Sequence, residues 1–130
     1  MNPTTMSDWE TAMTGTLARD FGGVTYAVTG LPTADGGEVL YSLQDMARAE
    51  RAIALAALTD GRRDPAALRF ARKSMGYTRA GFAASMDVAL FTVEVCEDGR
   101  EAVAPEMVGR IIGMLTQSDR GGFVAQRVTV

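Results

Sequence analysis

The 130-residue chain contains no histidine and only one cysteine, Cys96. Histidine is the commonest general base near neutral pH and the commonest ligand of transition metals, so its absence removes the main residue of both kinds of site. One cysteine cannot form a disulfide within these residues, and a zinc site made of one thiol and carboxylates would be unusual. The carboxylates show no pairing typical of acid–base catalysis. We therefore expect a protein that is not an enzyme and that holds no metal and no cofactor.

Long apolar runs are also missing, and the first ten residues, MNPTTMSDWE, lack the basic and apolar regions of a signal peptide. We therefore expect a cytoplasmic protein with no membrane contact. Hydrophobic residues make up 47% of the chain, which is enough to form a folded core. The length favours one domain, or a small domain with a short appendage.

Positive charge is scarce in the first half of the chain. Residues 1–60 contain eight acidic and three basic side chains, whereas residues 61–130 contain eight acidic and ten basic ones. A basic cluster lies between residues 62 and 79 and consists of Arg62, Arg63, Arg69, Arg72, Lys73 and Arg79. Such a patch is compatible with nucleic-acid binding, and it is equally compatible with arginine-rich helices that simply face water.

The first 60 residues predict two helices and a hairpin. Ser7 to Glu10 has the form of a capping box, which predicts a helix from Ser7 to Arg19 that ends at Gly22-Gly23. Two β-rich runs, residues 24–29 and 38–43, flank the turn-forming sequence GLPTADGG and predict a hairpin. A second helix is predicted from Asp45 to Thr59, with a buried stripe formed by Met46, Ala49, Ile53 and Ala56 or Ala57.

Four short helices are predicted after Pro65, over residues 65–75, 79–86, 90–98 and 105–116. Thr78 is the expected N-cap of the second of these helices. Only Asp87, Val88 and Ala89 separate the second helix from the third, which is short enough to set two helices at a steep angle. The final sequence, GGFVAQRVTV, is compatible with a strand or with a frayed tail.

The 48-residue segment from Leu68 to Leu115 contains Leu68 with Arg72, Gly76, TRAGFA (78–83), TVEVCEDG (92–99) and PEMVGRIIGML (105–115). With these pieces the segment resembles the Cro/repressor-type (XRE) helix-turn-helix family. The resemblance implies a mainly α fold class, in which a lambda-repressor-like helix-turn-helix domain covers residues 64–117. A small α/β-hairpin region over residues 1–60 would precede this domain, and a C-terminal tail over residues 118–130 would follow it.

Apolar residues in this segment recur at the spacing that a small helical core needs. The expected core consists of Leu68, Ala71, Met75, Phe82, Ala83, Met86, Val88, Val93, Cys96, Ile111 and Leu115. Cys96 is therefore expected to be a buried thiol rather than a reactive one. The resemblance also implies a structural ion pair between Arg72 and Glu97, which would join the first and third helices of the domain.

A weaker resemblance links YAVTGLPTADGGEVLYSL to the end of the hairpin-bearing zinc domain of MqsA-type antitoxins. The paired cysteine ligands of that domain are absent, and Thr33 and Gly36 stand roughly where one pair would be. We therefore expect no zinc site here. The resemblance implies that the N-terminal region serves in dimerisation or binds a protein partner, such as a toxin or another regulator.

In the repressor-type family the first residues of the third helix, and one near its end, face the bases. The corresponding residues here are Ala89, Leu90, Phe91 and Val95, flanked by Thr92 and Glu94. Apolar side chains of this kind contact thymine methyl groups, and a glutamate accepts a hydrogen bond from the cytosine amino group. Phosphate contacts are expected from Arg69, Lys73, Thr78, Arg79 and Arg100.

The stretch MDVALFTVEVCEDG (86–99) has four acidic residues and no basic one, which is unusual for a surface that meets DNA. Two functional hypotheses follow. The first is a sequence-specific transcriptional regulator of the repressor type, with an antitoxin-like role as a variant. It would bind a palindromic double-stranded operator as a homodimer, with helix Leu90–Asp98 in the major groove. The second is a protein–protein interaction module, an antitoxin or anti-activator that keeps the fold without binding DNA.

Overall fold

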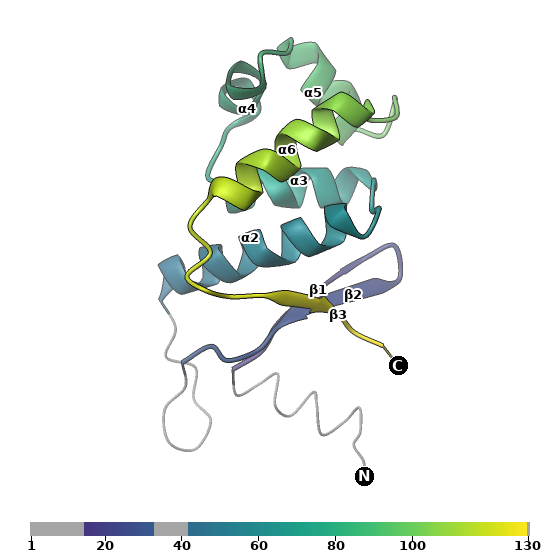
Figure 1. Ribbon diagram of the computed structural model, residues 1–130. Coiled ribbons are helices and arrows are strands. Elements are labelled where there is room, and N and C mark those ends of the chain that lie inside the picture. Colours follow the sequence, from purple (N-terminus) through teal and green to yellow (C-terminus); the bar gives the residue numbers. More distant parts are fainter. Residues whose placement is uncertain (1–14, 33–41, 130) are drawn as a thin grey trace.

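The computed structural model describes residues 15–32 and 42–129. These residues form a mainly helical structure with a three-stranded antiparallel sheet in the order β1-β2-β3. Helix α2 (Leu43–Thr59) lies between the sheet and the remaining helices (Figure 1). None of the helices in this described part of the chain combines the length and apolar character that a membrane span requires.

Strands β1 (Leu17–Phe21) and β2 (Val24–Val28) form a hairpin closed by Gly22-Gly23. The two glycines have φ values of 61° and 85°, and positive φ at both central residues is what a tight type I′ hairpin turn requires. The predicted helix from Ser7 to Arg19 is therefore wrong over residues 17–19, which belong to β1. Its first part, residues 7–14, lies outside the described residues. The glycine pair closes a hairpin here instead of ending a helix.

Within the described residues β2 pairs with β1 and β3, and the second strand of the predicted hairpin, residues 38–43, is described only at its last two residues. Residues 38–41 of that strand lie outside the described residues, and Ser42 and Leu43 begin α2 instead. The Ser42 hydroxyl accepts a hydrogen bond from the Asp45 amide at 3.1 Å, and the Asp45 carboxylate accepts one from the Ser42 amide at 3.3 Å. This reciprocal capping box fixes the start of the helix, so the prediction is wrong at these two residues.

Helix α2 is buried on two sides. One side packs on the sheet and belongs to the sheet cluster, formed by Leu17, Phe21, Tyr26, Val28, Leu31, Ala49, Ala52, Ile53, Ala57 and Ala67. The other side, with Ala54 and Leu58, belongs to the cluster formed by the other helices. The predicted stripe is confirmed at Ala49, Ile53 and Ala57. Its small alanine side chains let the sheet and the helices approach the α2 backbone closely.

The four helices after Pro65 match the predicted ones to within one residue at each end. They are α3 (Pro65–Ser74), α4 (Arg79–Met86), α5 (Leu90–Glu97) and α6 (Pro105–Gln117). All eleven predicted core residues lie in or against one cluster, in which Met75 and Val88 are only partly buried. This helical cluster consists of Ala54, Leu58, Leu68, Ala71, Phe82, Ala83, Met86, Val93, Val95, Cys96, Met107, Ile111 and Leu115.

The C-terminal segment forms a strand rather than a frayed tail. Strand β3 (Ala125–Arg127) pairs with β2 in antiparallel register, with Arg127 opposite Tyr26. The Tyr26 hydroxyl donates a hydrogen bond of 2.5 Å to Asp60, and Arg127 donates one of 3.2 Å to the same carboxylate oxygen. Burial, together with the hydrogen bond to Asp60, raises the pKa of Tyr26 to about 12. These contacts join β2, β3 and the end of α2.

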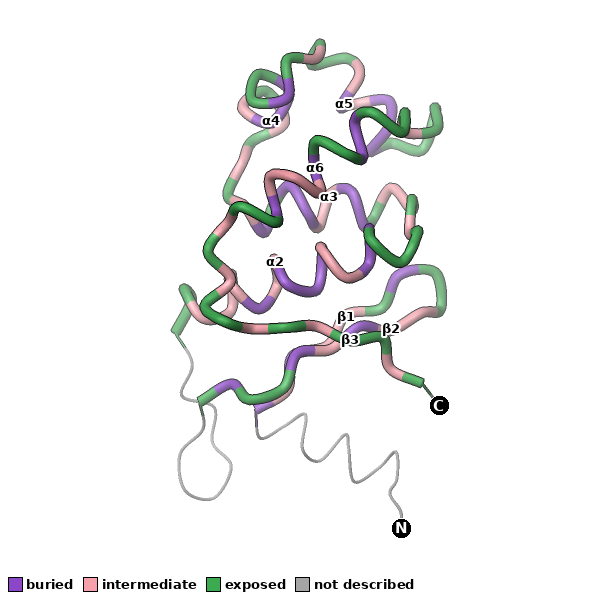
Figure 2. The backbone as a smooth tube through the Cα atoms, in the orientation of Figure 1, coloured by how far each residue is buried: buried purple, intermediate pink, exposed green. Residues whose placement is uncertain are grey.

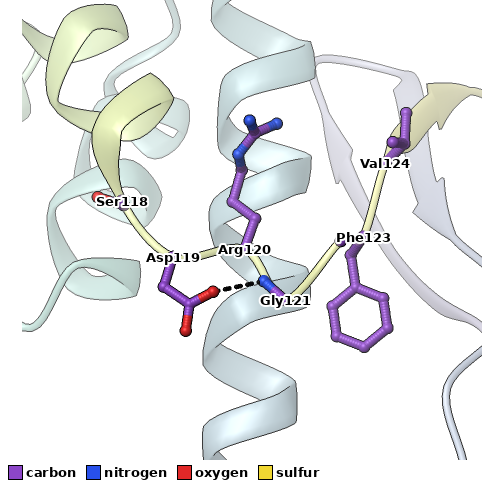
Figure 3. A pocket seen from close by; sticks show the side chains of 7 residues that line it. Ser118, Asp119, Arg120, Gly121, Phe123 and Val124 are labelled. Carbon is purple, nitrogen blue, oxygen red and sulfur yellow. Dashed lines mark hydrogen bonds between the residues drawn. The ribbon is translucent and has the colours of Figure 1, made fainter.

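The loop between α6 and β3 crosses α2 (Figure 1) and is held by two arginines of that helix. Arg51 donates to the Asp119 carbonyl at 3.0 Å, and Arg48 lies 2.7 Å from the Asp119 carboxylate. The same carboxylate accepts a hydrogen bond of 2.8 Å from the Gly121 amide (Figure 3). Residues 118–124 also line a shallow hollow of about 250 Å³.

Candidate nucleic-acid interface

Helices α4 and α5 lie at the end of the molecule opposite the sheet (Figure 1). Their connection is short because Asp87 takes a left-handed conformation, with φ of 57°, directly after α4. Aspartate tolerates this conformation better than most residues do. The Val88 amide then bonds to the Ala83 carbonyl at 3.0 Å, and the Val88 side chain packs against the helical cluster. The connection therefore fixes where α5 begins.

The first two residues of α5 are exposed and its last three are buried. Leu90 is 41% exposed and Phe91 is 61% exposed, and Ala89 before them is also exposed, whereas Cys96 and Glu97 lie in the core. Figure 2 shows exposed positions at the start of this helix. The Arg100 guanidinium lies over the Phe91 ring, 5.7 Å from its centroid. Thr92 and Glu94 are partly buried.

The prediction that Val95 faces the bases is wrong. Its side chain is only 3% exposed and belongs to the helical cluster. The reason is that α5 has only eight residues and its last turn packs into the core, so the helix has little surface beyond its first turn. The apolar surface of α5 therefore consists of Leu90 and Phe91 without Val95.

Arg72 and Glu97, the two residues expected to pair, form a bidentate ion pair between α3 and α5. Its two contacts are 2.7 Å, from Nε to Oε2, and 3.0 Å, from Nη2 to Oε1. Glu97 is 1% exposed, and Arg72 also donates a hydrogen bond of 2.9 Å to the Tyr77 carbonyl. A buried charge pair with these additional bonds is costly to break, so it fixes the angle between α3 and α5.

Three of the cations expected to bind phosphates meet at the C-terminal end of α5. Arg69 donates a hydrogen bond to the Glu97 carbonyl oxygen. Arg79 lies 3.3 Å from the Glu97 carboxylate and 3.5 Å from the Asp98 carboxylate. Arg100 lies 3.9 Å from the other carboxylate oxygen of Asp98, Oδ2. The structure therefore brings these arginines together around acidic groups.

Sequence reasoning missed this arrangement, although a signal for it was present. Glu97 and Asp98 stand at the C-terminal end of a helix, where the helix dipole disfavours negative charge. Two adjacent carboxylates in that position favour nearby cations. Arg100, two residues after Asp98, was therefore a candidate partner, whereas the sequence did not point to Arg79.

The other two expected phosphate ligands stand apart from this group. Lys73 is exposed on the last turn of α3. The Thr78 hydroxyl accepts a hydrogen bond of 3.0 Å from the Gly81 amide and so caps α4, as expected. Within residues 15–32 and 42–129, no three acidic or cysteine side chains gather closely enough to hold a metal ion.

The Cys96 thiol lies in the helical cluster and is 4% exposed. Burial raises the pKa of Cys96, and the nearby carboxylates of Glu101 and Glu97 raise it further. A thiol in this environment stays protonated and unreactive at neutral pH. Cys96 therefore serves as a packing residue of α5.

Comparisons with protein-family models, with curated proteins and with solved structures found no match for this chain.

Proposed function

We propose that α3 to α6 form a helix-turn-helix unit of the Cro/repressor type, and that the protein is a cytoplasmic, sequence-specific transcriptional repressor. The observation that supports this proposal best is the short connection from α4 to α5, which leaves the first turn of α5 exposed at one end of the molecule. A recognition helix needs this placement, because its first residues must reach the base edges in the major groove. The bidentate pair of Arg72 and Glu97 holds that helix at a fixed angle.

Base contacts in this proposal come from Leu90 and Phe91, which would pack on thymine methyl groups. Glu94 would accept a hydrogen bond from a cytosine amino group. Phosphate contacts would come from Lys73, Thr78 and the arginines at positions 69, 79 and 100. Two copies of the chain would bind half-sites about 34 Å apart, one helical turn along the DNA.

The test is fluorescence anisotropy of the protein with DNA from upstream of its own coding region, over a salt series. We expect binding that exceeds binding to a shuffled sequence and that weakens as salt rises. Phe91→Ala should lose most of the preference for the upstream sequence. Val124→Ala is the matched control, because Val124 is an exposed apolar side chain (68%) outside α5. Equal sequence preference in all three proteins would exclude Phe91 from base contact.

A second candidate function is a protein–protein interaction module that keeps this fold without binding DNA. The specific observation in its favour is that Arg69, Arg79 and Arg100 are all engaged by the acidic end of α5. The exposed pair of Leu90 and Phe91 would then dock on a protein, and the N-terminal region would bind a toxin or another regulator. This candidate predicts no DNA binding even at low salt, together with self-association or partner binding that Phe91→Ala weakens.

A further inference from the structure

The ion pairs at the end of α5 fall into two classes. The pair of Arg72 and Glu97 is buried, with side chains 9% and 1% exposed. The pairs around Asp98 are open to water: Asp98 is 43% exposed, Arg79 is 37% exposed and Arg100 is 60% exposed. Exposed ion pairs contribute little to stability, and their members change partners easily. Breaking a buried ion pair is costly. Only the contacts to Asp98 can therefore be given up without disturbing the fold. Arg79 belongs to both classes, because its Nε also lies 3.3 Å from the buried Glu97 carboxylate. That contact can be kept while the Nη2 group of Arg79 changes partner.

Asp98 lies between two arginines and faces one with each carboxylate oxygen. One carboxylate oxygen faces Arg79 at 3.5 Å and the other faces Arg100 at 3.9 Å. The two arginines come from different elements, the start of α4 and the loop after α5. Arginine binds carboxylate and phosphate oxygens with the same donor geometry, so either anion fits between them.

We propose that Asp98 is an internal competitor of DNA phosphates, and that Arg100 and the Nη2 group of Arg79 transfer from Asp98 to the DNA backbone when the protein binds. This inference rests on the proposed function. Each arginine that Asp98 retains is one fewer cation available to displace counterions from DNA, so Asp98 lowers binding to every sequence alike. Asp98 is not among the residues that contact bases in the proposed function, which are Leu90, Phe91 and Glu94. The result is a protein whose binding depends more on base sequence and less on general attraction to DNA.

The first test compares Asp98→Asn with Asp87→Asn. Both changes remove one negative charge from the α4–α5 region, and Asp87 forms no ion pair with the residues that the structure describes. Asparagine also suits the left-handed conformation of residue 87. Asp98→Asn should bind shuffled and upstream DNA about two- to fivefold more tightly than Asp87→Asn does. Its plot of log affinity against log salt should steepen by about 0.9 for each further phosphate that the released arginines neutralise.

The second test repeats Asp98→Asn in a chain that already carries Arg79→Ala and Arg100→Ala. The increase in affinity should then fall to the increase that Asp87→Asn gives, because the arginines that Asp98 would release are gone. If Asp98→Asn raises DNA affinity by the same factor in this chain as in the wild-type protein, Asp98 acts only by repelling DNA phosphates. That result overturns the proposal. Circular dichroism and thermal unfolding of every variant check that the fold is intact.

Two outcomes separate this inference from the proposed function. If the wild-type protein binds DNA and Asp98→Asn behaves like Asp87→Asn, the competitor role fails and the proposed function stands. If neither the wild-type protein nor Asp98→Asn binds any DNA at low salt, the proposed function fails and the competitor role fails with it.

Discussion

The two hydrophobic clusters on either side of α2 are fixed by different kinds of polar contact. The helical cluster contains a buried ion pair, Arg72 with Glu97, that joins helices close together in the sequence. The sheet cluster is closed at its edge by Tyr26, Asp60 and Arg127, which bring together distant parts of the chain through hydrogen bonds near the surface. This difference indicates that the stability of the helical cluster depends strongly on one buried contact, the pair of Arg72 and Glu97. The stability of the sheet cluster is spread over several smaller contacts, and three sets of variants test this comparison.

The largest effect is expected in the helical cluster, from Glu97→Ala. This change leaves the Arg72 guanidinium buried without its partner, which typically costs about 3–5 kcal/mol of unfolding free energy. Urea unfolding followed by circular dichroism measures it. Asp98→Asn, at the exposed end of the same helix, is the control and should change stability by less than about 0.5 kcal/mol. Equal small losses for both variants would show that the buried pair does not dominate this cluster.

A smaller effect is expected where the hairpin turn meets the loop after α2. A Cβ atom at Gly22 would lie 2.5 Å from the Asp64 carboxylate, whereas one at Gly23 would meet nothing within 4 Å. Both residues have positive φ, so alanine at either position costs about 1–2 kcal/mol of unfolding free energy in backbone strain. Gly22→Ala should cost somewhat more than Gly23→Ala, because Asp64 must move. Identical unfolding free energies would show that the turn does not press on this loop.

The smallest effect is expected from Tyr26→Phe, which removes one hydrogen bond and should cost about 1 kcal/mol near neutral pH. This variant also tests a pH dependence. The pKa of Tyr26 is raised to about 12 from an ordinary value of 10.0, so its stabilising contribution is complete below pH 10 and is lost as the pH rises towards 12.

The wild-type protein should therefore lose stability between pH 10 and pH 12 that Tyr26→Phe does not lose. Tyr77→Phe is the control for general tyrosine ionisation, because Tyr77 lies outside the contacts of Asp60. If the wild-type protein and Tyr26→Phe lose the same unfolding free energy between pH 10 and pH 12, the pKa of Tyr26 is not raised as the structure indicates.

The helices after Pro65 could be predicted closely because their signals are local. Pro65 and Pro105 mark helix starts, Thr78 caps α4, and Gly76 and Gly99 follow helix ends. The sheet could not be predicted in the same way. Gly22-Gly23 fits both a helix stop and a hairpin turn. The hairpin strands pack on α2 and pair with β3, and both of these elements come later in the sequence.

The candidate interface was predicted in part, and its errors have a common cause. In α5, LFTVEVCE is apolar at most positions, so no periodic pattern distinguishes the buried Val95 from the exposed Phe91. The depth to which a short helix enters the core is set by its neighbours rather than by its own sequence. The pairing of Arg79 and Arg100 with Asp98 likewise depends on how α4 and the loop after α5 are placed around the end of that helix.

Helix α2 packs one face against each cluster, so its backbone is covered on both sides. Exposing the backbone amides of α2 to solvent requires that both clusters separate from it. The middle of α2 should therefore exchange its amide hydrogens only in the rarest and largest opening of the protein, and more slowly than the first turn of α5. In an exchange experiment, the alanines between the sheet and the helices would mark the slowest unit of the fold.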